Sequence, residues 1–271
     1  MAKLEFAERG AGGRPLLLLH GFTGAKEDFT EWLEPLAQAG WHAVAPDHRG
    51  HGASEKPSNE SDYTFATLAN DAFALADELW GSDSPFVLLG HSMGGMVAQV
   101  MATQFPDRVA ALVLMDTLYG PLPFVTREEI EAAVAVVQER GTDGLADLFA
   151  ERGSPLDTPA HLRLLEERAG YAEFNDRKFR DTASAAYAGL LAAMYEADDR
   201  LASLRTLAMP TLVIAGEQDK PIVQPSRDMV AAITGADLAI ITDAGHSPQF
   251  ENPEAWWSAL STFLERVGTR V

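Results

Sequence analysis

The fold is decided by residues 86–104, FVLLGHSMGGMVAQVMATQ. This stretch begins with a continuous apolar run at 86–90, as expected for a strand buried on both faces, and ends in a helical stretch at 96–104. A glycine-flanked serine between a strand and a helix is the context that the G-x-S-x-G nucleophile elbow requires. The turn is predicted to hold the hydroxyl of Ser92 clear at the carboxyl edge of a sheet, where the helix N-terminus favours negative charge. The alternative is a glycine-rich turn that only packs the helix closely on the sheet.

The rest of the chain alternates short apolar runs with helical patterns. The expected strands are residues 3–8, as a short antiparallel edge strand, 15–20, 41–47, 109–116, 211–216 and 238–242. Residues 64–80 have apolar side chains at helical spacing, and Asn252 can cap a helix that starts at Pro253. This alternation predicts an α/β fold with a mostly parallel, doubly wound sheet.

Residues 117–207 interrupt the alternation, because they contain no convincing strand. Thr126 and Glu129 have the spacing of a capping box and are predicted to open a helix. A second helical stripe is formed by Phe179, Ala183, Ala186, Tyr187, Leu190 and Met194. A helical insertion late in the core predicts a cap at 117–207 over a core made of residues 1–116 and 208–271.

Ser92 needs a base, because a neutral hydroxyl is a weak nucleophile. His246 lies in the segment DAGHSP, directly after the last expected strand and therefore at the same sheet edge as Ser92. The base in turn needs an anion that fixes its tautomer. Asp219, which closely follows the strand 211–216, gives the chain order serine, aspartate, histidine that accompanies a nucleophile elbow. Asp116, at the end of the preceding strand, is the rival for this role.

An oxyanion formed at this site would need two backbone donors. The N–H of Met93, which follows the nucleophile, is one candidate, and the N–H of Phe22 in the loop HGFTG is the other. Gly21 lets the backbone of that loop approach the site closely. His20 and His91 lie in or beside expected strands, so we expect them to pack and to form hydrogen bonds with the backbone. The other histidines are expected to be structural or exposed: His42, His48, His51 and His161.

Taken together, these pieces resemble the α/β-hydrolase family over nearly the whole chain. The matching segments are the HGFTG loop, DHRGHGAS at 47–54, GHSMGG at 90–95, the GEQD turn at 216–219 and GHSPQFENP at 245–253. The resemblance implies an eight-stranded sheet with a cap inserted after the sixth strand. Within the family, the chain looks most like small bacterial carboxylesterases and lactonases, including acyl-homoserine lactonases.

Departures from other branches of the family narrow the expected reaction. Haloalkane dehalogenases and epoxide hydrolases use an aspartate nucleophile, where this chain has Ser92. Carbon–carbon bond hydrolases usually show asparagine before the serine and a glycine-rich oxyanion loop, where this chain has His91 and Phe22. The similar synthase of menaquinone biosynthesis carries an arginine at the position of Met96. We therefore expect a serine hydrolase that cleaves esters or lactones through an acyl-enzyme; a carbon–carbon bond hydrolase, a perhydrolase and a triad-bearing ligand receptor with slow turnover are the alternatives.

Apolar residues near the start of the insertion and on its helices are candidates for a substrate pocket. They are Leu118, Tyr119, Leu122, Phe124, Phe149, Tyr187 and Met194. The alternative is that they form the core of the cap, because an amphipathic helix must bury one face. If some of them face Ser92, they form an apolar slot that suits a medium acyl chain, as in an N-acyl-homoserine lactone.

Composition limits the partners of the chain. Its 271 residues, 46% of them apolar, suffice for one large domain or for a core with an insertion. A formal net charge of −19 disfavours nucleic acid and anionic membranes, which leaves a small-molecule ester or lactone as the expected partner. The absence of cysteine excludes thiolate metal sites and cysteine nucleophiles, and the expected mechanism needs no metal or cofactor. The segment MAKLEFAERG lacks the apolar core of a signal peptide, so a cytoplasmic location is expected.

Overall fold

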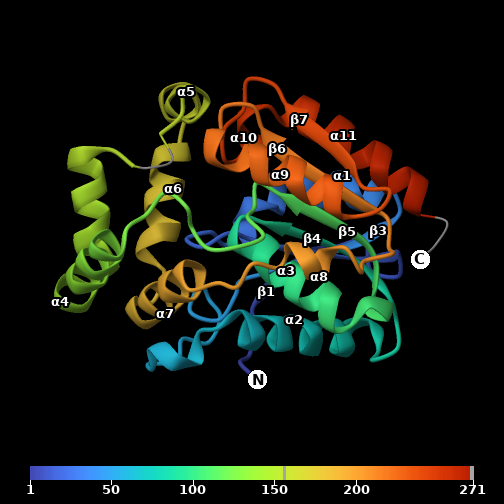
Figure 1. Ribbon diagram of the computed structural model, residues 1–271, viewed down its shortest axis with the longest axis horizontal. Coiled ribbons are helices and arrows are strands. Elements are labelled where there is room, and N and C mark those ends of the chain that lie inside the picture. Colours follow the sequence, from blue (N-terminus) through green and yellow to red (C-terminus); the bar gives the residue numbers. More distant parts are fainter. Residues whose placement is uncertain (155–156, 269–271) are drawn as a thin grey trace.

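A seven-stranded sheet forms the centre of the protein, which is represented by a computed structural model describing residues 1–154 and 157–268 (Figure 1). The strands are β1 (Phe6–Arg9), β2 (Arg14–Leu19), β3 (Trp41–Pro46), β4 (Phe86–His91), β5 (Val109–Met115), β6 (Thr211–Gly216) and β7 (Asp237–Ile241). Their order in the sheet is β1-β3-β2-β4-β5-β6-β7, and only the β1–β3 pair is antiparallel in the described residues. The expected α/β class with a mostly parallel sheet is confirmed. The eight strands that the resemblance implies are wrong for the described residues, because only β1 lies beyond β3 at the first edge of the sheet. The helical segment 117–207 therefore follows the fifth strand and not the sixth.

Helices cover both faces of the sheet (Figure 1). Those outside the insertion are α1 (Thr30–Gln38), α2 (Phe65–Trp80), α3 (Met93–Gln104), α9 (Lys220–Ala232), α10 (Pro248–Glu251) and α11 (Pro253–Val267), with short 3-10 turns at Lys26–Asp28, Glu60–Asp62 and Pro106–Arg108. Two helix starts follow from side-chain capping, in which a side-chain oxygen accepts from an otherwise unpaired N–H. Thr64 accepts from the N–H of Thr67, and Asn252 accepts from the N–H of Ala255, so both predicted starts are confirmed.

The central strands place alternate side chains in two apolar cores. On β2, Leu17 joins the core formed with α2 and α3, whereas Leu16 joins the core formed with α1 and α11. On β4, Leu88 and Val87 repeat this division, and they are in register with Leu17 and Leu16. Because both faces of these strands are buried, their sequences are continuous apolar runs rather than alternating ones.

The segment between β5 and β6, called the helical insertion below, contains helices and no strand in its described residues. The helices are α4 (Arg127–Arg152), α5 (Pro159–Glu167), α6 (Tyr171–Arg180), α7 (Ser184–Tyr195) and α8 (Leu201–Leu204). Thr126 accepts from the N–H of Glu129 and begins α4, as the capping-box spacing predicts. Gly141, with a φ of 70°, breaks α4 into two helical parts. Helices α4 to α7 lie together beside the sheet (Figure 1).

The expected single helical stripe from Phe179 to Met194 is wrong. Phe179 lies near the end of α6, whereas Ala183 caps the start of α7, because the chain turns between the two helices. The hydroxyl of Thr142 donates to the carbonyl of Thr182 at 3.0 Å and holds this turn against α4. Both helices bury apolar side chains in the same core, which is why the apolar spacing continues across the break.

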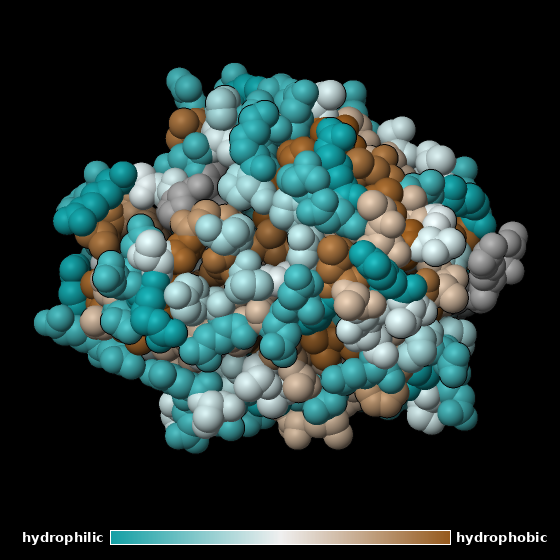
Figure 2. Space-filling view, in the orientation of Figure 1, coloured by the Kyte–Doolittle hydropathy of each residue, from teal (hydrophilic) through white to brown (hydrophobic). Residues whose placement is uncertain are grey.

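The surface is largely hydrophilic on the face shown in Figure 2, with smaller apolar areas between the insertion and the sheet. This agrees with a chain in which 23% of the residues are charged and the formal net charge is −19. In the described part of the chain, none of the helices combines the length and the apolar character needed to cross a membrane.

Candidate active site

Ser92 lies at the turn between β4 and α3. Its backbone has a φ of 54° and a ψ of −120°, a conformation that residues other than glycine rarely adopt. The Ser92 N–H donates to the carbonyl of Met115 at 2.8 Å, and the Thr117 hydroxyl donates to the carbonyl of Ser92 at 2.6 Å. A Cβ on Gly94 would lie 2.5 Å from two backbone oxygens where β2 ends, so only glycine lets α3 approach the sheet this closely. The local sequence thus builds the elbow from close packing and these two hydrogen bonds.

Ser92, His246 and Asp219 come together at the carboxyl edge of the sheet. His246 Nε2 lies 2.9 Å from Ser92 Oγ, and His246 Nδ1 lies 2.6 Å from Asp219 Oδ2. The three residues follow β4, β7 and β6, whose carboxyl ends meet at one edge because these strands are parallel. The imidazole can therefore take a proton from the hydroxyl while its other ring nitrogen donates to the carboxylate, which is the geometry of an activated nucleophile.

The surroundings of His246 favour its protonated form. Burial by itself lowers the pKa of the imidazole, but the charge and hydrogen bond of Asp219, with a further contribution from Glu251, more than offset burial and raise the pKa above 6.5. Lys178, on α6, acts in the opposite direction. A raised pKa suits a group that must accept a proton from a hydroxyl and later return it to a leaving group.

Two further residues at the carboxyl edge of the sheet have a positive φ, as Ser92 does. Asp116 directly follows β5 with a φ of 43°, and Asp243 lies in the turn after β7 with a φ of 53°. Among the described residues, these three are the non-glycine residues with positive φ. Such a conformation costs about 1–3 kcal/mol and persists only where the surrounding structure enforces it. Backbone strain is therefore concentrated at the sheet edge that carries Ser92.

The loop after β2 lies against the elbow. A Cβ on Gly21 would lie 3.2 Å from the Cβ of Ser92, so the backbone that carries the N–H of Phe22 runs directly beside the serine. The N–H of Met93 is at the first position of α3, where a helix has no internal acceptor. Within the parts of the chain that are described, neither N–H donates to another protein group. Both expected donors are thus beside Ser92 and free to bind an oxyanion.

Three buried histidines pack behind this loop. The ring of His20 lies 4.4 Å from that of His48 and 5.0 Å from that of His51, between centroids. Burial lowers the pKa of all three, that of His48 to about 3, so the cluster is neutral. His20 Nε2 accepts from the N–H of His48, so its Nδ1 carries the proton and donates to the carbonyl of Gly21 at 2.7 Å. His51 Nε2 lies 2.5 Å from the carbonyl oxygen of Phe22. These histidines are structural, and none of them is exposed.

Asp116 does not take the place of Asp219 beside His246. Asp116 Oδ1 accepts from the N–H of Gly216 at 2.8 Å, and no donor faces its buried Oδ2 among the described residues. Asp116, Asp219 and His246 also offer three possible metal-ligand atoms within 4.8 Å of one another. Because His246 Nδ1 and Asp219 Oδ2 are hydrogen bonded to each other, this cluster forms part of the serine site and is not a separate metal centre.

The sequence profile of the family described as alpha/beta hydrolase fold matches residues 14–253, which include the elbow, the loop after β2 and the helical insertion. The chain belongs to the α/β-hydrolase family.

This α/β hydrolase is similar to small lactonases and esterases. It is 28% identical to 3-oxoadipate enol-lactonase 2 of Acinetobacter baylyi over 267 residues, which cover 97% of this chain and 93% of the relative. A solved thermophilic esterase from Thermogutta terrifontis is 28% identical, with a TM-score of 0.86 and coverage of 98% of this chain and 94% of that chain. The structure of Est816, described as an N-acyl homoserine lactone degrading enzyme, is 27% identical, with a TM-score of 0.75 and 97% coverage of both chains. The expected resemblance is confirmed.

Glu251 is a residue of the site that sequence reasoning missed. Its Oε2 accepts from the N–H of Gly245 at 2.5 Å and from the N–H of Ser247 at 3.2 Å, on either side of His246. Glu251 thereby fixes the loop that carries the imidazole, and burial raises the pKa of its carboxyl group. Nothing in the segment GHSPQFENP distinguishes this glutamate from a helical surface residue, because its partners are backbone groups.

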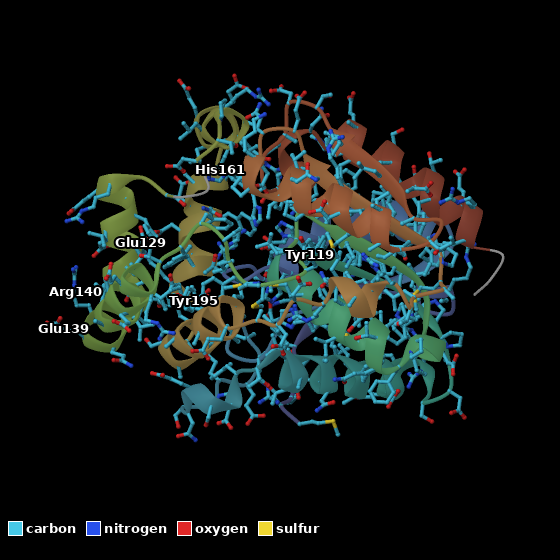
Figure 3. All side chains as sticks on the ribbon, in the orientation of Figure 1. Tyr119, Glu129, Glu139, Arg140, His161 and Tyr195 are labelled. Atoms are coloured by element: carbon cyan, nitrogen blue, oxygen red, sulfur yellow. The ribbon has the colours of Figure 1, made fainter. Side chains whose placement is uncertain are left out.

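Several polar contacts connect the helical insertion of the hydrolase to the rest of the chain beside the site, and two of them involve buried side chains. Lys178 Nζ on α6 lies 2.7 Å from Asp28 Oδ1, and the two side chains are 11% and 3% exposed. His161 lies on α5 and points toward the sheet (Figure 3), and its Nδ1 is 3.7 Å from Glu251 Oε1. Lys178 and Asp28 are 150 positions apart in the sequence, so no local pattern could have predicted this pair.

Some pocket candidates lie in an aromatic row that reaches the loop after β2. The ring of Tyr187 lies 4.7 Å from that of Phe22 between centroids, and Phe179 lies 5.9 Å from Tyr187 and 5.8 Å from Phe149. Met194 is buried in the same core. Tyr187 therefore links the insertion directly to the residue whose N–H flanks Ser92.

The remaining pocket candidates lie outside this aromatic row. Phe124 is 48% exposed, and Leu118 and Leu122 pack in a small core formed by β6, β7 and α9. The hydroxyl of Tyr119 donates to Asp228 on α9 at 3.3 Å, which places this ring over the core and away from the outer helix α4 (Figure 3). Leu118 is nevertheless close to the elbow, because the Thr117 hydroxyl faces the carbonyls of both Ser92 and Leu118. Tyr119 and Leu122 also pack against the core that contains Tyr187 and Met194.

Proposed function

We propose that the protein is a serine hydrolase that cleaves carboxylic esters or lactones through an acyl-enzyme on Ser92. The observation that carries the proposal is the pair of hydrogen-bonded distances at His246, 2.9 Å to Ser92 Oγ and 2.6 Å to Asp219 Oδ2. The names of the similar proteins, an enol-lactonase, an esterase and an N-acyl homoserine lactone degrading enzyme, all describe cleavage of an ester or lactone bond.

In the proposed first step, Ser92 Oγ attacks the carbonyl carbon while His246 Nε2 takes the hydroxyl proton. Asp219 accepts a hydrogen bond from Nδ1 and stabilises the imidazolium. The amides of Phe22 and Met93 bind the negative oxygen of the tetrahedral intermediate, for which such donors are worth several kcal/mol. When the intermediate collapses, the bond to the leaving oxygen breaks and His246 returns its proton to that oxygen.

The second step releases the acid. Water attacks the acyl carbon while His246 takes one of its protons, the Ser92 oxygen leaves, and His246 returns the proton to it. A lactone reacts in the same way, but the alcohol formed by ring opening remains part of the acyl group, so the product is a single hydroxy acid. These steps use side chains, backbone amides and water, so they require no cofactor.

We further propose that residues 117–207 act as a cap over a core made of residues 1–116 and 208–271. The contact between Tyr187 and Phe22 supports this arrangement, because it brings an apolar face of the insertion to the edge of the site. An apolar wall there favours a medium acyl chain over charged acids, since each buried methylene stabilises binding by about 0.8 kcal/mol, or roughly fourfold. N-acyl-homoserine lactones fall within this substrate class.

The nucleophile is tested with Ser92→Ala, which removes the hydroxyl and leaves the glycines of the elbow in place. Turnover of p-nitrophenyl esters and lactones should fall by about six decades, as in other triad enzymes, while circular dichroism stays unchanged. A fluorophosphonate should label Ser92 in the wild type, located by mass spectrometry of peptides. Retention of more than a tenth of the activity would overturn the assignment.

The substrate class is tested by kcat/KM across acyl chains of two to eight carbons. The values should rise with length, and Tyr187→Ala should flatten the rise by removing the wall beside Phe22. Phe105→Ala is the control, because Phe105 is 49% exposed and lies outside the insertion. A flat or falling wild-type profile, or activity confined to anionic substrates, would show that the acyl-chain proposal is wrong.

A further inference from the structure

Asp116 is a fully buried carboxyl group that the proposed mechanism does not use. It lies directly after β5, its Oδ1 accepts from the N–H of Gly216, and no donor in the described residues faces its Oδ2. An ionised carboxylate with an unpartnered buried oxygen is strongly disfavoured, because the charge has lost its water and gained one hydrogen bond. The backbone at Asp116 also has a positive φ of 43°, so the chain holds this group in place against strain.

A second carboxyl group lies beside it. Oxygens of Asp116 and Asp219 and a ring nitrogen of His246 all lie within 4.8 Å of one another. Two carboxylates this close inside a protein cannot both ionise without a large energetic cost, so one of them holds a proton. Asp219 Oδ2 already faces a donor, because His246 Nδ1 lies 2.6 Å from it, whereas Asp116 Oδ2 faces none among the described residues.

The charged groups around Asp116 favour its protonated form. Burial, followed by the negative charges of Asp219 and Glu251, raises the pKa of Asp116 well above its ordinary range, and the single N–H of Gly216 does not offset them. The positive charge that forms on His246 is already neutralised by Asp219. The proton therefore belongs on the oxygen of Asp116 that has no donor facing it.

We propose that Asp116 is a positioning residue for the serine site: it is a neutral acid whose Oδ2–H donates to the carboxylate of Asp219. The carboxylate then receives hydrogen bonds from two sides, from His246 Nδ1 and from Asp116, and keeps the orientation that the imidazole needs. Asp116 also adds no second negative charge beside His246. The inference rests on the proposed function where activity is measured, but the protonation state itself is independent of that function.

The first test compares Asp116→Asn with Asp116→Leu. Leucine has a similar volume but no donor, so kcat should fall about 10- to 100-fold with KM changed less than about threefold, in line with the loss of a hydrogen bond to a charged group. Asparagine can accept from Gly216 and donate to Asp219, as the neutral acid does, so Asp116→Asn should restore kcat to within about threefold of wild type. Equal losses in both variants would overturn the proposal. If Asp116→Leu does not fold, the asparagine variant alone decides through its pH profile.

That pH profile reports the charge on Asp116. Exchanging a neutral acid for a neutral amide should leave the acidic limb of kcat/KM, which follows His246, within about 0.3 pH units of wild type. If Asp116 were an anion, its removal would lower the pKa of His246 and move the limb about one unit or more toward acid. A shift of that size would overturn the proposal.

Thermal unfolding tests the proton without any substrate. A carboxyl group that is protonated when folded and ionised when unfolded releases a proton on unfolding, so it makes the protein less stable as pH rises above about 4. Asparagine has no such proton. The Tm of Asp116→Asn minus that of wild type should therefore grow from pH 5 to pH 8, and a constant difference would refute a protonated Asp116. Because this readout needs no turnover, it stays informative if Ser92→Ala shows that the proposed hydrolysis is wrong.

Discussion

Exchanging Asp219 for asparagine should disable the base while keeping the shape of the site. An asparagine can present its NH₂ group to His246 Nδ1, which lies 2.6 Å from Oδ2 in the native protein. Nδ1 must then accept, so the ring proton moves to Nε2. Nε2 lies 2.9 Å from Ser92 Oγ and would now donate to the hydroxyl instead of taking its proton. The imidazole stays in place but has the wrong tautomer.

The expected loss is large because it affects the transition state and not the binding of substrate. The same exchange in a triad of this geometry lowers kcat by about four decades, which corresponds to about 5.4 kcal/mol. In this hydrolase, Asp219→Asn should lower kcat on a p-nitrophenyl ester by this order, with KM changed less than about threefold. Circular dichroism and the Tm should show an intact fold, since a carboxylate is replaced by an amide of equal size.

Asp243→Asn is the matched control. It removes a carboxylate from the loop that carries His246, but Asp243 is exposed and pairs with Arg163 at 2.8 Å instead of with the imidazole. An exposed pair of this kind contributes about 0–1 kcal/mol, and asparagine tolerates the positive φ at this position. Activity within tenfold of wild type for Asp219→Asn, or an equal fall in the control, would refute the assigned role of Asp219.

Three other predictions follow from the surroundings of the site. Because the pKa of His246 is raised and only the neutral imidazole is a base, kcat/KM should rise with pH through a midpoint above 6.5, and a midpoint below 6 would contradict the described electrostatics. Glu251→Ala would remove the acceptor of the buried Gly245 amide and of the partly buried Ser247 amide. An unpaired buried amide costs about 1–3 kcal/mol, so the free energy of unfolding in urea and kcat should both fall, and unchanged values would show that the loop does not depend on Glu251. Lys178→Met would leave the buried carboxylate of Asp28 without its ion-pair partner and should lower the free energy of unfolding in urea by about 3–5 kcal/mol. Adding Asp28→Asn should recover much of this free energy. A double variant as unstable as the single one would argue against the pair.

The sheet and the elbow could be predicted because their causes are local. Leu16 and Leu17 enter different cores, so the strand that contains them has to be a continuous apolar run, and that run is visible in the sequence. The glycines around Ser92 are required by contacts within one turn and with the adjacent strand. The positions of Asp219 and His246 followed from chain order, since parallel strands bring their carboxyl ends to one edge.

The parts that could not be predicted depend on distant contacts or on breaks that periodicity does not reveal. The apolar spacing from Phe179 onward continues through a turn because α6 and α7 bury side chains in one core. Glu251 acts on backbone amides, and Lys178 meets Asp28 across 150 positions, so neither has a signal in its own segment. The number of strands came from resemblance alone and was one too high.

The positive φ angles of Ser92, Asp116 and Asp243 mean that the native residues at the sheet edge are not the most stable choices for their own backbone. Glycine has no side-chain penalty in this conformation, so glycine substitutions there are candidates for relieving strain. A deep mutational scan read out by heat resistance alone should therefore score Ser92→Gly as neutral or beneficial, whereas a scan read out by turnover should score it as inactive. Laboratory evolution toward a higher melting temperature would replace residues at this sheet edge first, unless every round also selected for turnover. The strained backbone at this edge therefore creates a trade-off between stability and activity.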